Sequence, residues 1–254
     1  MTAAPVASVA PNPIRRLLAA AVRGPDYAAD AGDLVDVRVA GLAIPLRATV
    51  ALFVATAAIV LDETRRLVAP AVDSALGTAD PATNLAFERA ILFGALPFVV
   101  LAAGFRDAPS RYGLTLGAWR WGAGLLLAGL VIMTPIIAWL STLPEFSGYY
   151  QGAAAPIGTI LLRNVLELGP AEFLLRGFLM FALLRRIGPL AIVVVQVPFV
   201  LTHVGKPEIE LWSTFFGGSV FAWLDWRTGS VLWSALGHVY ILSLMVVLAG
   251  GLAG

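Results

Sequence analysis

Long apolar runs constrain this chain more than any other feature. They occupy residues 44–61, 85–105, 119–140, 157–186, 188–204, 210–226 and 229–252. An α-helix rises about 1.5 Å per residue, so each run is roughly long enough to cross a hydrocarbon layer about 30 Å thick. With 59% hydrophobic and 13% charged residues, the chain lies outside the range of soluble proteins. We therefore expect an all-α, polytopic transmembrane bundle of about seven helices, with an eighth if residues 153–168 cross or re-enter the membrane separately.

The residue types that are scarce exclude other classes of protein. The net charge is +1 and the basic residues are scattered singly or in pairs, so nothing indicates a nucleic-acid partner. The chain contains no cysteine, which removes disulfides, thiolate nucleophiles and cysteine-bound metals. The partners that composition predicts are therefore membrane lipids.

The first 43 residues differ from the rest of the chain. A proline-rich lead is followed by Arg15 and Arg16, and no apolar stretch is long enough for a secretory signal. We expect residues 1–43 to form a non-spanning arm with one short interfacial helix at Ile14–Val22. Residues 44–254 would then form the transmembrane bundle.

The arginines predict the orientation of the bundle, because cytoplasmic connections carry the excess of basic residues. The basic residues that alternate in this way are Arg15, Arg16, Arg23, Arg38 and Arg47 before the first run, Arg106, Arg111 and Arg120 around the second connection, Arg185 and Arg186 after the fourth run, and Arg227 after the sixth. This pattern predicts a cytoplasmic N-terminus.

Four polar residues interrupt the apolar runs at comparable depths. The stretch GPAEFLLRG, residues 169–177, carries Glu172 and Arg176, and both histidines of the chain, His203 and His238, lie in later runs. Counted along the helices, Glu172 lies ~20 Å, His203 ~22 Å and His238 ~14 Å above the cytoplasmic edge. Ionisable groups at such depths are costly and usually mark a functional site or a buried pair. We therefore expect these residues to share one pocket in the outer half of the membrane.

Two interpretations of these side chains stay open from the residues alone. Glu172 and Arg176 are spaced i and i+4, so they share a helix face and can form either a structural ion pair or part of a catalytic site. Gly169 and Pro170 just before them indicate a helix start or a kink. Each histidine can join two helices by a hydrogen bond, orient a water molecule, or bind a metal. Glu172, His203 and His238 form a weak alternative zinc site, but we expect neither a metal nor another cofactor.

Three short motifs resemble those of one family of intramembrane proteases. The motifs AEFLLR (171–176), FVLTH (199–203) and HVYIL (238–242) are similar to the Glu-Glu-x-x-x-Arg, Phe-x-x-x-His and His-x-x-x-Asn/Asp motifs of the CPBP family, the CAAX-prenyl endopeptidase and bacteriocin-processing (Abi) group. The resemblance covers residues 109–245. It implies a glutamic-type mechanism in which the first glutamate and the second-motif histidine activate water, while the third-motif residues stabilise the oxyanion.

Two positions depart from the family pattern. Ala171 occupies the place of the first glutamate, which the resemblance identifies as the general base, and Leu242 occupies the place of the final Asn or Asp. Neither side chain can accept a proton or a hydrogen bond. Ala171 has three explanations: a deliberate substitution that traps an inactive enzyme, a natural non-catalytic relative, or an enzyme that uses Glu172 instead. We favour the first, and Tyr240 or Ser243 are candidates to replace the missing third-motif donor.

The resemblance implies an integral membrane peptidase, of the bacterial inner-membrane type, that cleaves near the C-terminus or membrane segment of a membrane-associated protein and is inactivated by Ala171. The alternative is a non-catalytic membrane binder of the immunity or chaperone type. Other intramembrane chemistries fit less well, since the chain has no His-Glu-x-x-His helix and no pair of intramembrane aspartates. We expect Asp225 to pair with Arg227 or to face the interface, and the pair Tyr149 and Tyr150 to be an interfacial anchor.

Overall fold

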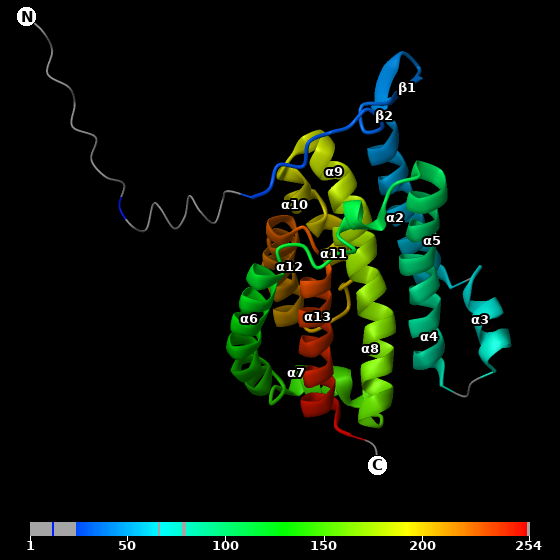
Figure 1. The fold of residues 1–254 in the computed structure, drawn as a ribbon. Coiled ribbons are helices and arrows are strands. Elements are labelled where there is room, and N and C mark those ends of the chain that lie inside the picture. The colour runs from blue at the N-terminus through cyan, green and yellow to red at the C-terminus, as the bar shows by residue number, and fades with distance from the viewer. Residues whose placement is uncertain (1–11, 13–23, 66, 78–79, 253–254) are drawn as a thin grey trace, which may run out of the picture.

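The computed structural model describes residues 12, 24–65, 67–77 and 80–252 (Figure 1). It is an α-helical bundle with one small β hairpin, as the composition predicts. The elements are β1 (Asp36–Val39), β2 (Leu42–Pro45), α2 (Leu46–Thr64), α3 (Ala69–Leu76), α4 (Pro81–Arg89), α5 (Leu96–Val99), α6 (Trp119–Leu140), α7 (Pro144–Tyr150), α8 (Ile157–Glu172), α9 (Met180–Ile187), α10 (Leu190–Val194), α11 (Gln196–Leu201), α12 (Glu208–Thr228) and α13 (Leu232–Met245).

Each predicted span coincides with helical structure. Three of the described helices are long and apolar enough to cross a membrane, by length and composition: Pro81–Phe105, Trp119–Leu140 and Leu232–Gly250. The first of these joins α4 and α5 through π-helical turns, and the third extends α13 by one such turn. Helices α2, α8 with α9, and α12 are comparably long but carry more charged residues.

The fourth apolar run is one continuous helix, so of the two outcomes predicted at Gly169 and Pro170, a helix start or a kink, the helix start is wrong. Residues 157–187 are helical throughout, and residues 153–168 form no separate eighth span. Pro170 lies inside α8 and has no N–H to donate to the preceding turn. A π-helical segment, Phe173–Leu179, follows at once, and such a widened turn can absorb the irregularity without ending the helix.

The run at 188–204 is not a spanning helix, which corrects the sequence prediction. It forms α10 and α11, and together these cover only Leu190–Leu201. Twelve helical residues rise ~18 Å, which is less than the hydrocarbon layer requires. His203 therefore lies in the turn after α11 rather than within a spanning helix.

The helix formed by α8 and α9 is the centre of the bundle. Every residue from Phe173 to Leu184 is buried. On one side it packs against α2 and α4, and on the other side against α13, which in turn packs against α6 (Figure 1). Helix α2 approaches closely because its inner face is made of small residues, namely Ala48, Ala51, Ala55 and Ala58.

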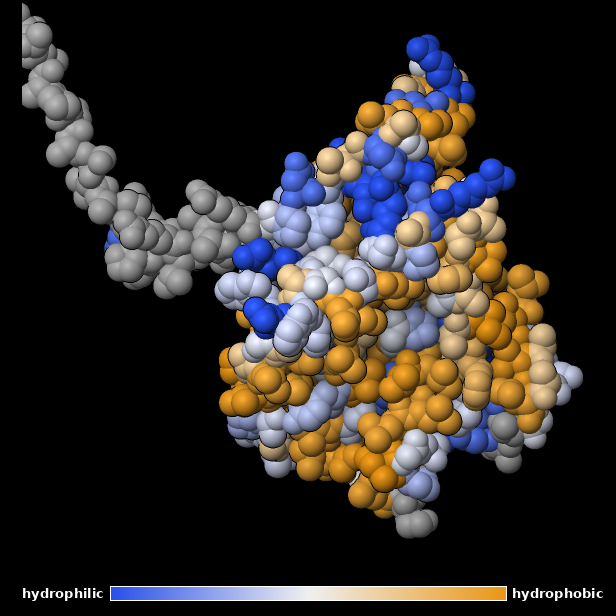
Figure 2. Space-filling view, in the orientation of Figure 1, coloured by the Kyte–Doolittle hydropathy of each residue, from blue (hydrophilic) through white to orange (hydrophobic). Residues whose placement is uncertain are grey.

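The surface agrees with a membrane protein whose two ends differ in polarity. Figure 2 shows a broad hydrophobic area across the face in view and hydrophilic residues gathered at the end that carries the hairpin. Large apolar side chains are exposed on the helices, such as Phe53 on α2 and Val131 and Leu127 on α6. In a bilayer these side chains would contact lipid rather than water.

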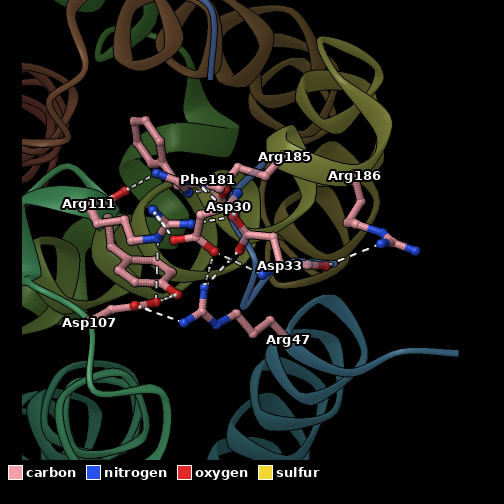
Figure 3. Close-up of polar contacts among 9 residues, drawn as sticks. Asp30, Asp33, Arg47, Asp107, Arg111, Phe181, Arg185 and Arg186 are labelled. Atoms are coloured by element: carbon pink, nitrogen blue, oxygen red, sulfur yellow. Dashed lines mark hydrogen bonds and ion pairs between the residues drawn. The ribbon is translucent and has the colours of Figure 1, made fainter. Parts of the chain in front are cut away.

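An ion-pair network at the hairpin end fixes the segment before α2. Asp33 is buried and pairs with Arg47, at 3.1 Å, and with Arg111 (Figure 3). Asp107 also pairs with Arg47, at 2.9 Å. Burial raises the pKa of Asp30, but a hydrogen bond from the backbone N–H of Asp33 and the guanidinium groups of Arg111 and Arg47 together lower it by more. The pKa of Asp30 therefore lies below its usual range. The arm predicted for residues 1–43 is therefore anchored to the bundle at its end, while the predicted helix at Ile14–Val22 lies outside the described residues.

Candidate active site

A cavity of about 430 Å³ lies between the central helix and its neighbours. Its walls come from α2, α4, α7, α8, α11, α13 and the segment after α7. Ala171, His203, His238 and Leu242 all line it. The three family-like motifs, which are far apart in sequence, are thus brought together at one cavity.

The first motif places Ala171 toward the cavity and Glu172 away from it. Ala171 lines the cavity, whereas Glu172 does not and is only 1% exposed. One oxygen of Glu172 accepts a hydrogen bond from Arg176, and the other is 2.6 Å from Nδ1 of His238. Consecutive residues on a helix are about 100° apart, which explains the two directions. Glu172 therefore cannot act on a molecule in the cavity without leaving both of its partners.

Arg176 joins the first motif to the other two. Its guanidinium lies 4.0 Å from the ring centre of Phe199 and 5.6 Å from that of Phe221, and the side chain is buried. A cation held over an aromatic face is stabilised by the ring quadrupole. Phe199 is the phenylalanine of the second motif, so Arg176 and Glu172 together hold elements of all three motifs in register.

His203 presents a hydrogen-bond acceptor to the cavity. Its Nδ1 lies 2.8 Å from the backbone carbonyl of Phe199, and because a carbonyl only accepts, Nδ1 must carry the proton. In the neutral ring Nε2 then has a free lone pair. The His203 and His238 rings are nearly parallel, with centroids 6.2 Å apart and an interplanar angle of 16°. The two imidazoles therefore face the same space.

His238 is oriented by a carboxylate. Because the oxygen of Glu172 accepts, Nδ1 of His238 carries a proton, and Nε2 is the nitrogen left for other contacts. With Nδ1 protonated, Nε2 accepts in the neutral ring and donates only when the ring carries a second proton. Glu172 fixes the orientation of the ring in either form.

Asn164 is a cavity residue that the sequence interpretation missed. It lies on α8, is buried, lines the cavity, and donates from Nδ2 to Oγ of Ser243 at 2.9 Å. Ser243 does not line the cavity, and Tyr240 is hydrogen bonded to Thr134 at 2.6 Å. Neither Ser243 nor Tyr240 therefore lines the cavity, whereas Asn164 brings a side-chain amide to it. Its position seven residues before Ala171, on the same helix face, was the available signal.

A second group of missed residues consists of Asp62, Arg89 and Glu167, which also line the cavity. Arg89 donates from Nε and Nη2 to both oxygens of Asp62 at 3.0–3.1 Å, and from Nη1 to Oε1 of Glu167. The three side chains join α2, α4 and α8. Arg89 was available as a signal, because it lies within the apolar run at 85–105.

The cavity reaches the end of the bundle opposite the hairpin. Tyr149 and Tyr150 belong to α7, which lies at that end in Figure 1, and both line the cavity, as do Arg163 of α8 and Lys206. The interpretation of the two tyrosines as an interfacial anchor is wrong for Tyr150, which is 4% exposed and donates its hydroxyl to Glu210 at 2.7–2.8 Å. Both tyrosines form part of the cavity wall instead.

Asp225 is also placed differently from the prediction. It is fully buried and accepts a hydrogen bond at 2.8 Å from the hydroxyl of Ser234, which lies in the first turn of α13. Arg227 points elsewhere and lies 5.3 Å over the ring of Trp121. Asp225 therefore joins α12 to α13 and neither pairs with Arg227 nor faces the interface.

The weak zinc alternative gains no support from the geometry. Among the residues that the structure describes, no three His, Asp or Glu side chains are placed to share a metal ion. Glu172 and His238 are bonded directly to each other, whereas metal ligands point toward a common ion. The absence of a cofactor stays a prediction.

Comparison with known proteins identifies the region that holds the site. A family model described as type II CAAX prenyl endopeptidase Rce1-like matches residues 153–243, and this range includes all three motifs. No curated protein and no solved structure matches the chain. Residues 153–243 are therefore similar to the Rce1-like type II CAAX prenyl endopeptidases.

Proposed function

We propose that this chain is a CAAX-type intramembrane peptidase that hydrolyses a peptide bond near the C-terminus of a membrane-associated protein, and that Ala171 strongly lowers its activity. The observation that carries the proposal is the pair of parallel imidazoles, His203 and His238, beside the cavity that Ala171 faces. A cavity of about 430 Å³ lies within the size range of ligand sites. It can accept a few residues of an extended peptide.

Each retained side chain has a role in such a reaction. Nε2 of His203 accepts a hydrogen bond from the attacking water and so orients it. Nε2 of His238 donates to the oxyanion of the tetrahedral intermediate, and Glu172 with Arg176 holds that ring. Nδ2 of Asn164 is a second candidate donor, in place of the third-motif residue that Leu242 replaces. No metal or other cofactor takes part in this proposal.

The missing group is the carboxylate at position 171. A positioned general base typically contributes about 10²- to 10⁴-fold to a rate, so we expect the loss of this glutamate alone to make turnover weak or undetectable. Ala171 faces the cavity, and a glutamate there would point its carboxylate into the same space. The alternative function, a non-catalytic membrane binder, keeps the same cavity without turnover.

The decisive test compares cells that carry this chain with cells that carry Ala171→Glu. Mass spectrometry of membrane proteins would search for newly shortened C-termini. We expect trimming to increase with the glutamate, by about 10²-fold or more, and to disappear when His203→Ala is added. If neither chain trims any membrane protein while both bind the same membrane polypeptides, the peptidase proposal fails and the binder is favoured.

We also propose that the N-terminus is cytoplasmic, in a bacterial-type inner membrane, and that the cavity opens to the outer side. The ion-pair network around Asp33 lies at the hairpin end of the bundle, and the cavity is lined by Tyr149 and Tyr150 of α7, which lies at the opposite end (Figure 1). The natural chain has no cysteine, so Ser147→Cys gives a unique label near the mouth. Labelling of intact cells by a membrane-impermeant reagent is expected. Labelling only after lysis would reverse the orientation.

A further inference from the structure

Besides the histidines, the cavity holds a carboxylate that the family motifs do not include. Among the described residues that line it, the acids are Asp62 and Glu167. Building on the proposed function, we infer that Glu167 acts as the general base of this chain in place of the missing glutamate at position 171. The inference rests on the placement of Glu167 on α8, on the state of its oxygens, and on the exclusion of the other acids.

Glu167 lies on the same face of α8 as Ala171. The two residues are spaced i and i+4, which places their side chains one above the other, with a rise of ~6 Å between them. Both line the cavity, together with His203 and His238. Ala171 is a small residue, so it leaves the space between Glu167 and the histidines open to a water molecule and a peptide.

In the other nearby acids, Glu172 and Asp62, both carboxylate oxygens already accept hydrogen bonds. Glu172 has one oxygen bonded to Arg176 and the other to His238, and it does not line the cavity. Asp62 is 6% exposed, and both of its oxygens accept from Arg89. Neither carboxylate can take a proton from a molecule in the cavity without breaking an ion pair.

Glu167 differs from both of them. Only its Oε1 accepts from Arg89, no described partner occupies Oε2, and its side chain is 27% exposed. Arg89 is itself fixed by Asp62 on α2, so the contact to Oε1 holds the carboxylate in place while Oε2 stays accessible. A base needs this combination of a fixed position and a free oxygen.

The reaction is balanced with the groups present. Oε2 of Glu167 takes a proton from the water as the water oxygen bonds to the peptide carbonyl carbon, and the carbonyl oxygen becomes the oxyanion near His238. When the C–N bond breaks, Glu167 returns the proton to the leaving nitrogen. One water is consumed, and a new carboxylate and a new amine are the products.

The test crosses two substitutions, Glu167→Gln and Ala171→Glu, in the full-length protein. Membranes from cells that express each of the four chains would be incubated in H₂¹⁸O, and truncated C-termini carrying one ¹⁸O would be quantified by mass spectrometry. Glu63→Gln is the matched control, because Glu63 is an exposed acid outside the cavity. We expect Glu167→Gln to lower the rate of the natural chain about 10²-fold or more. In the Ala171→Glu background it should lower the rate less than about threefold, because the usual base is then present.

The remaining outcomes separate this inference from the proposed function. If the Ala171→Glu chain is active while the natural chain is inactive, or while Glu167→Gln leaves the natural rate unchanged, the peptidase proposal stands and the role of Glu167 is refuted. Loss of activity in both backgrounds would make Glu167 a positioning or folding residue and also refute its role as a base. If all four chains are inactive, the proposed function itself fails.

Discussion

The buried pair of Glu172 and Arg176 should be strongly coupled in stability. The Glu172 side chain is 0% and the Arg176 side chain 1% exposed, so neither charge is screened by water. Removing Glu172 leaves the Arg176 charge buried without a carboxylate, and removing Arg176 leaves His238 as the remaining partner of Glu172. Breaking a buried pair in this way costs about 3–5 kcal/mol. Replacing both by apolar residues of similar volume removes this penalty. It leaves only Nδ1 of His238 without its acceptor, a cost of about 1–3 kcal/mol.

The assay is thermal unfolding in detergent, followed by circular dichroism, for Glu172→Leu, Arg176→Met and the double variant. At about 2–4 °C per kcal/mol for a chain of this size, each single change should lower the midpoint by about 6–20 °C. The double variant should fall by about 2–12 °C rather than by the sum of the two single changes.

The matched control is Lys206→Met, which breaks an i,i+4 pair with Glu210 whose side chains are 20% and 17% exposed. A pair that water reaches is worth about 1 kcal/mol or less, so the midpoint should shift by about 4 °C at most. Additive losses in the Glu172→Leu/Arg176→Met variant would refute the reasoning, because they would mean that the two charges are not held by each other.

Three further predictions concern other parts of the molecule. Gly218→Ala should lower the free energy of unfolding by about 1–3 kcal/mol, measured by the same thermal assay, because an added Cβ would lie 2.7 Å from the ring of Phe199. Asp30→Asn should make the unfolding midpoint less sensitive to acid. The pKa of Asp30 is lowered in the folded chain, so its contribution is present above the ordinary Asp pKa of about 3.9 and is lost as the pH falls through the folded value. Asn164→Leu in the Ala171→Glu chain should lower the trimming rate about 10²-fold if the amide donates to the oxyanion, whereas Ser243→Ala, which removes only the partner of that amide, should lower it less.

The sequence predicted the helices well because hydropathy alone determines where a chain can cross a bilayer. The sequence prediction was wrong at two places where a proline affects where a helix starts or ends. Pro170 predicts a helix start or a kink, and it lies inside a continuous helix that is followed by a π-helical segment. The run at 188–204 was read as a span, yet it forms two short helices. Neither outcome follows from composition, because both depend on whether neighbouring helices compensate for a lost backbone hydrogen bond.

The candidate site was predictable through its rare residues and not through its common ones. A histidine or a buried Glu–Arg spacing stands out in an apolar run, so His203, His238, Glu172 and Arg176 were found. Asn164 and Glu167 lie in a part of α8 that contains several polar residues, so neither stands out in the sequence. Only the folded chain shows that both line the cavity that Ala171 faces. The direction of Glu172 could not be deduced either, because its two partners come from different helices.

The geometry separates binding from catalysis in this chain. The orientation of His238 depends on Glu172 and Arg176, and these contacts do not involve residue 171. The tautomer of His203 depends on the carbonyl of Phe199, which is likewise independent of residue 171. A chain with alanine at position 171 therefore retains the contacts that orient both histidines in a chain with glutamate there. If the proposed function holds, substrate affinity should be nearly equal in the two chains and the glutamate should change the rate alone. The chain with Ala171 would then hold a membrane polypeptide for much longer than an active relative takes to cut it.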